Sequence, residues 1–116
     1  MQKDDLVFAG QMLDTSRKVV TKVEGKSREE FDSDENLRMA MVHLIQILGE
    51  AARRVSPTFQ QAHPEIPWKP IIGMRHRVVH DYLNVDFDIV WSVAKSDLPP
   101  LIADLEKFVP PVETDS

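Results

Sequence analysis

Residues 33–55, SDENLRMAMVHLIQILGEAARRV, decide the fold, because they carry one unbroken helical pattern. Apolar residues recur at steps of three and four, which places them on one face of an α-helix. The acid-rich start suits the positive end of the helix dipole. The stripe consists of Leu37, Ala40, Met41, Leu44, Ile47, Leu48, Ala51 and Val55. The pattern predicts a long amphipathic helix that buries this stripe.

A second long helix is predicted before this one, between Asp5 and Gly25. It has the same spacing in a mostly apolar stripe of Leu6, Ala9, Leu13, Ser16, Val20 and Val23. Gly25 is a typical helix-ending residue. Ser27 and Glu30 then show the spacing of a capping box, which marks a new helix start.

The residues after 55 predict a connector and two more helices. Residues 56–67 hold three of the eight prolines and no sustained period, so they are expected to connect, with about one helical turn. Residues 68–81 resume a helix. NVDFD, residues 84–88, leads into a last helix that Pro99 and Pro100 should kink or split.

The expected fold is therefore all-α, an up-and-down four-helix bundle, since no alternating strand pattern bounded by hairpin turns is evident. Residues 1–110 should form a single domain. Residues 111–116 should form a flexible C-terminal tail.

Composition limits the classes of function. The chain has no cysteine, which excludes a disulfide framework, thiolate catalysis and zinc sites built on sulfur. The start, MQKDDLVF, has acids where a signal peptide has its basic region, and no stretch reaches the roughly 18 apolar residues of a membrane span. A cytoplasmic protein without a membrane partner is expected.

Charge is distributed unevenly along the chain. The net charge of −5 argues against broad adhesion to nucleic acid, which depends on Lys and Arg neutralising phosphates. Residues 51–80 nevertheless carry a local +4, with one acid and the basic residues Arg53, Arg54, Lys69, Arg75 and Arg77. If these five share one face, they are candidates for contacts with RNA.

The same region contains MRHRVVHDYL, residues 74–83, where arginines, histidines and a tyrosine crowd together. His76 and His80 have the H-x3-H spacing that can chelate a metal on a helix. The neighbouring acids and His63 complete no recognised ligand pattern. We therefore expect neither a metal site nor a cofactor.

An arginine and a histidine together suit RNA cleavage. Arginine grips phosphate oxygens and offsets charge in phosphoryl transfer, while histidine moves a proton near neutral pH. Attack by the ribose 2′-hydroxyl on the adjacent phosphate needs no metal and no protein nucleophile. On a regular helix, however, Arg75 and His80 would lie about 140° apart. They could border one groove if the helix loosens near Tyr82 or if a second subunit closes the cleft.

A structural role fits the same residues. A basic cluster near a helix C-terminus is favoured by the helix dipole, and a tyrosine just beyond it can pack between helices. From the residues alone, both interpretations stay open.

Three segments resemble the HepT-like toxins of the HEPN superfamily, the DUF86 group. LIQILGEAARRVS, residues 44–56, is similar to the family's I-I-G-E-A segment, and IPWKPIIGMRHRVVHDYL, residues 66–83, resembles its signature with R-x4-H-x-Y. DFDIVWSVAKSDLPPL, residues 86–101, resembles the W and L-P stretch that follows. The resemblance spans nearly the whole chain in the family's order.

This resemblance implies an all-helical homodimer that acts as a metal-independent endoribonuclease. Arg75 would stabilise the scissile phosphate, and His80 would act as general acid or base. Tyr82 would receive AMP from the cognate antitoxin, a minimal nucleotidyltransferase encoded nearby, as in a type VII toxin-antitoxin system. The alternative is a catalytically inactive HEPN module that binds nucleotide, RNA or a partner protein.

Two positions depart from the family pattern. His76 stands where the family usually has Asn, so it could assist catalysis, bind substrate or merely replace the amide. Leu83 stands where an aromatic residue is common. Neither change removes Arg75, His80 or Tyr82.

Overall fold

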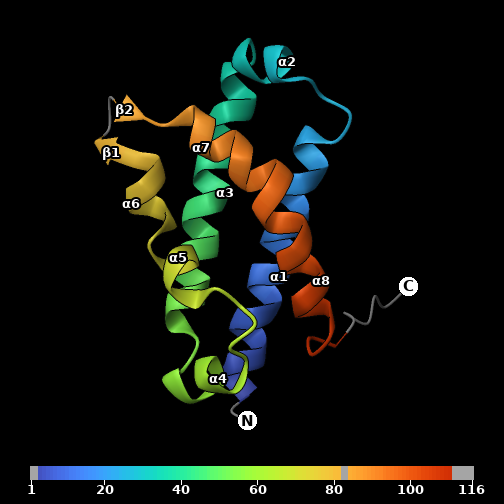
Figure 1. Cartoon of the computed structure of the whole chain (residues 1–116), viewed down its shortest axis with the longest axis vertical. Helices are drawn as coiled ribbons and strands as arrows, with labels where there is room; N and C mark the ends of the chain where they lie inside the picture. The colour runs from blue at the N-terminus through green and yellow to red at the C-terminus, as the bar shows by residue number, and fades with distance from the viewer. Residues whose placement is uncertain (1–2, 82–83, 111–116) are drawn as a thin grey trace.

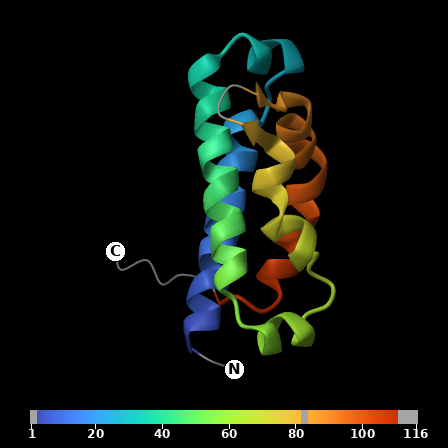
Figure 2. The same cartoon turned by 90° about the vertical axis from the view of Figure 1, so that its left-hand side faces the viewer.

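Two long antiparallel helices, α1 and α3, form the frame of the protein, and shorter elements cover one side of them (Figures 1 and 2). The computed structural model describes residues 3–81 and 84–110. The helices are α1 (Lys3–Val23), α2 (Arg28–Asp32), α3 (Glu35–Arg54), α4 (Pro57–Ala62), α5 (Trp68–Ile72), α6 (Met74–Val78), α7 (Phe87–Ser92) and α8 (Leu98–Glu106), with a π-helical segment η1 (Val93–Asp97). The strands β1 (Val79–Asp81) and β2 (Asn84–Val85) form one antiparallel pair. The prediction of an all-α helical bundle is confirmed.

The helix boundaries follow the local signals of the sequence. Gly25 has a φ of 74°, a left-handed conformation that favours glycine, and it lies just beyond the end of α1. The Ser27 and Glu30 capping box is present. Asp34 accepts a hydrogen bond from the Leu37 backbone N–H at 3.0 Å and so caps α3. The long helix predicted over residues 33–55 is therefore confirmed to within two residues.

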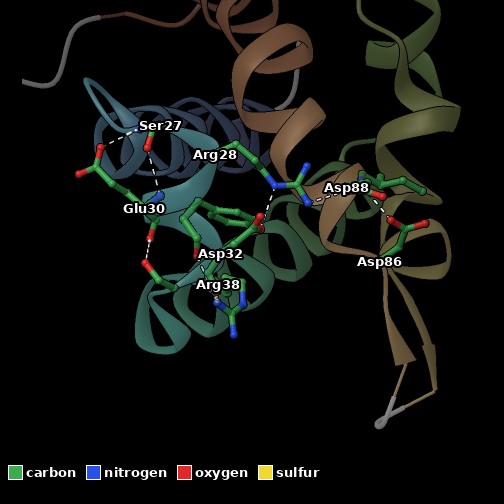
Figure 3. Close-up of polar contacts among 10 residues, drawn as sticks. Ser27, Arg28, Glu30, Asp32, Arg38, Asp86 and Asp88 are labelled. Atoms are coloured by element: carbon green, nitrogen blue, oxygen red, sulfur yellow. Dashed lines mark hydrogen bonds and ion pairs between the residues drawn. The ribbon is translucent and has the colours of Figure 1, made fainter.

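The short helix α2 connects the α1–α3 frame to α7, as Figure 3 shows. Arg28 donates hydrogen bonds to Asp32 at 2.9 Å and to Asp88 at 2.5 Å. Phe31 is fully buried and packs against Phe87 and Trp91, with ring centroids 6.3 and 5.1 Å away. Because the ion pairs are exposed, the buried aromatic contact contributes more to this junction.

The prediction of one continuous helix over residues 68–81 is wrong. The helix is interrupted at Gly73, between α5 and α6, and α6 ends at Val78. The Val78 carbonyl accepts a 2.7 Å hydrogen bond from the Asp86 backbone N–H, which closes a hairpin in place of another helical turn. The resulting strand pair is also absent from the sequence-based expectation.

The last helix is split, as the prolines predict. Widening to π-helical geometry occurs in η1, where the Leu98 backbone N–H donates to the Val93 carbonyl, five residues back. Pro99 and Pro100 follow directly in the first turn of α8, where a missing N–H costs least. Among the described residues, no helix is long and apolar enough to cross a membrane.

Two glycines provide a matched test of packing between α3 and α5. A Cβ on Gly49 of α3 would lie 3.2 Å from the Ile71 backbone oxygen, whereas a Cβ on Gly10 of α1 would meet only the Val109 side chain, at 3.9 Å. Alanine is favoured over glycine within a helix by about 1 kcal/mol, but overpacking against a fixed backbone costs about 1–3 kcal/mol. In urea unfolding, Gly10→Ala should raise the free energy of unfolding and Gly49→Ala should lower it. Equal gains from both substitutions would contradict the close approach of α3 and α5.

Candidate functional site

Residues 74–81 present two buried apolar side chains to the core and their basic side chains and histidines to the surface. Met74 and Val78 are buried, at 2% and 0% exposure, and anchor the segment against the bundle. The side chains that could bind a ligand or take part in catalysis are all exposed; they are Arg75, His76, Arg77 and His80. Among the described residues, none of these four side chains forms an ion pair. This arrangement leaves them available to a ligand.

His80 lies on β1 and not on the helix that carries Arg75. The backbone becomes extended at Val79, with φ −110° and ψ 104°. The separation of about 140° expected between Arg75 and His80 on a regular helix therefore does not apply. His76 and His80 do not share a helix face either, because only His76 lies on α6. The hairpin pairs Asp81 with Asn84, whose side-chain amide donates to the Asp81 carboxylate at 2.9 Å. Tyr82 and Leu83, between these two residues in the sequence, lie outside the described residues.

Arg75 borders an open groove of about 460 Å³ that is lined mainly by residues of α3. We call it the Arg75 groove. Its lining residues are Gln11, His43, Gln46, Ile47, Glu50, Ala51, Arg54 and Arg75. The structure therefore brings together two of the predicted site residues, Arg54 and Arg75, which lie 21 positions apart in the sequence.

The groove has a positive charge although the chain as a whole is negative. Glu50 accepts hydrogen bonds from Arg53 at 2.5 Å and from Arg54 at 3.3 Å, and these contacts lower the pKa of its carboxyl group, the Arg53 bond most. With Glu50 ionised, the groove lining carries a net charge of +1 from two arginines and one glutamate. A groove of this sign attracts phosphate groups.

The remaining basic candidates do not share this groove. Arg53 lies beside Arg54 but is not part of the lining, and Lys69 is exposed on α5. Arg77 borders a separate hollow of about 320 Å³, lined by residues of α5, α6, η1 and α8. The five basic residues of the 51–80 stretch therefore do not line one groove.

The sequence-based interpretation missed three polar residues of α3, His43, Gln46 and Glu50. With the predicted Arg54 they recur at steps of three and four, which places all four on one helix face. The same spacing could have revealed this second stripe beside the apolar one. Ile47, predicted as part of the buried stripe, is 38% exposed at the edge between the two stripes.

His63 has a packing role. Its ring stacks on Phe108, with centroids 4.1 Å apart, and lies 4.5 Å from the ring of Phe59. Its backbone carbonyl accepts a 2.9 Å hydrogen bond from the Trp68 indole N–H. These contacts hold the 63–67 connector against the end of α8. Within residues 3–81 and 84–110, no three His, Asp or Glu side chains come together as potential metal ligands.

The groove of this helical bundle is lined by two arginines and a histidine, side chains that can bind a phosphate group and transfer a proton. Residues 12–108 match the model of the ribonuclease HepT-like family, and the chain belongs to this family.

Individual relatives agree with the family match. "Probable ribonuclease HepT" of Thermococcus cleftensis is 35% identical over 80 residues, 69% of this chain and 73% of the relative. "Putative RNase MJ1380" of Methanocaldococcus jannaschii is 27% identical over 105 residues, 90% of this chain and 96% of the relative. No solved structure shows a significant match to the chain.

Proposed function

We propose that this protein is the toxin of a type VII toxin-antitoxin pair and cleaves RNA as a metal-independent endoribonuclease. The observation that carries the proposal is the exposed Arg75 and His80 within a chain that matches the ribonuclease HepT-like family over residues 12–108. Arg54 and the other groove residues add a positively charged surface beside Arg75.

In the proposed reaction, the ribose 2′-oxygen forms a bond to the adjacent phosphorus while the bond to the 5′-oxygen breaks. A proton leaves the 2′-hydroxyl and a proton joins the departing 5′-oxygen, so the products are a 2′,3′-cyclic phosphate and a 5′-hydroxyl. His80 transfers one of these protons, as general acid or base. Arg75 binds the non-bridging phosphate oxygens and stabilises their developing charge. His76, exposed next to Arg75, is a candidate for an auxiliary role.

The test is cleavage of RNA by the purified protein in excess EDTA. Cleavage should persist, because the proposed groups need no metal, and the new ends should be cyclic phosphates and 5′-hydroxyls. Activity that disappears in EDTA and returns with a divalent cation would contradict this mechanism.

We also propose that the active form is a homodimer. A domain of 116 residues is too small to surround an RNA strand, and Arg75 and His80 are exposed in the single chain. Light scattering at micromolar concentration should give twice the chain mass of 13.3 kDa. A monomer alone at that concentration would reject the dimer.

The proposed partner is a minimal nucleotidyltransferase antitoxin, encoded next to this chain, that transfers AMP to Tyr82. The family match supports this pairing. A gene for a short nucleotidyltransferase beside the gene for this chain is the simplest observation that would strengthen it.

A further inference from the structure

The lining of the Arg75 groove contains amide, imidazole and apolar side chains in addition to the arginines that could bind a phosphate. Two amide side chains, Gln11 from α1 and Gln46 from α3, lie in the lining with the imidazole of His43. Ile47 adds an exposed apolar surface to the same groove. We propose that the groove binds one unpaired nucleotide of the RNA substrate, next to the phosphate that is cut. The inference rests on the proposed ribonuclease function and specifies its substrate.

Two arginines of the groove would bind the phosphate of the nucleotide. Arg54 and Arg75 both line the groove, and Arg75 has no ion-pair partner among the described residues. Among the described residues, Glu50 is the one acid in the lining, and it is already bound by Arg53 and Arg54. The groove can therefore accept a phosphate without first breaking an ion pair of Arg75.

The glutamines and the isoleucine of the lining would bind the base of the nucleotide. An amide has both a donor and an acceptor and can pair with the edge of a nucleobase, as asparagine and glutamine do in nucleic-acid recognition. Ile47 offers an apolar contact to the face of the base. The volume of about 460 Å³ lies in the range of about 300–1,000 Å³ typical of small-ligand sites. A base held in this way must be unpaired, because its edges and face are engaged by the protein.

The salt dependence of binding provides the first test. The probe is a fluorescent 2′-O-methyl RNA oligonucleotide, which lacks the attacking hydroxyl and cannot be cleaved through it. Arg54→Ala should weaken its affinity and reduce the slope of log K against log salt by about 0.7, the loss of one phosphate contact in a single strand. Arg53→Ala is the matched control, because Arg53 also pairs with Glu50 and is similarly exposed but does not line the groove.

Base preference provides the second test. Four homopolymer probes of the same 2′-O-methyl type should differ in affinity, and Gln46→Ala should change their relative affinities by roughly 3- to 10-fold, as expected for one hydrogen bond. Gln61→Ala is the control, since Gln61 is exposed on α4, away from the groove. Equal effects of the paired variants, in either test, would overturn the assignment.

The remaining outcomes separate this inference from the proposed function. If the wild-type protein cleaves RNA but the groove variants bind the probes normally, the groove assignment fails and the ribonuclease stands. If the groove variants lose binding while no cleavage occurs, the nucleotide site stands and the catalytic proposal fails. If Arg54→Ala instead converts a dimer into a monomer in light scattering, the groove is a subunit contact and the nucleotide assignment is rejected.

Discussion

His80→Ala should reduce RNA cleavage by about 10²-fold or more, because a positioned acid or base contributes about 10²–10⁴ to such a reaction. His80 is exposed on β1, so the substitution removes a proton-transfer group without opening a cavity in the core. The measurement is the single-turnover rate on an RNA substrate, with wild-type and variant proteins compared at the same pH. Growth arrest on expression should be lost in parallel.

Two controls make this result specific to chemistry. The thermal midpoint of His80→Ala should stay close to that of the wild type, since surface substitutions usually change stability by less than about 0.5 kcal/mol. Binding of the non-cleavable probe should also persist, because His80 is not part of the groove lining. Full cleavage activity in His80→Ala would remove this residue from the mechanism and assign the proton transfer to another group.

The sequence predicts the long helices well because their signals are local. The apolar stripe and the acidic N-cap are both contained within the segment that forms α3. The failure at residues 68–81 has a non-local cause, since the hydrogen bond between Asp86 and Val78 joins residues on either side of the hairpin. No periodicity within residues 74–81 contains that information.

The candidate site is predictable in part for the same reason. The motif identifies Arg75, His76 and His80, whose exposure agrees with a role at the surface. The grouping of Arg54 with Arg75 depends on the packing of α6 against α3, and the separation of Arg77 depends on which side of α6 faces α8. A count of charges along the chain cannot distinguish these two sides.

AMP transfer to Tyr82 should abolish cleavage without unfolding the protein. Tyr82 is the only tyrosine in the chain and stands two residues after His80 in the sequence. A spacing of seven residues would place Arg75 and Tyr82 on one face of a continuous helix, but α6 ends at Val78, so a shared helix face does not explain the effect of AMP. An attached AMP would instead add a negatively charged phosphodiester two residues along the chain from His80, the proposed acid or base. That charge would repel the RNA phosphate and could occupy an exposed arginine such as Arg75.

The experiment incubates the protein with the neighbouring nucleotidyltransferase and ATP, then measures intact mass, the modified peptide and RNA cleavage. AMP should map to Tyr82, and cleavage should fall in proportion to the modified fraction, while circular dichroism stays unchanged. Tyr82→Phe should cleave RNA and resist neutralisation, because it lacks the phenolic oxygen that forms the bond to the AMP phosphorus. AMP confined to another residue, or full neutralisation of Tyr82→Phe through AMP transfer, would instead assign Tyr82 to packing. Since no second tyrosine can substitute for Tyr82, the comparison between the two proteins tests the modified residue directly.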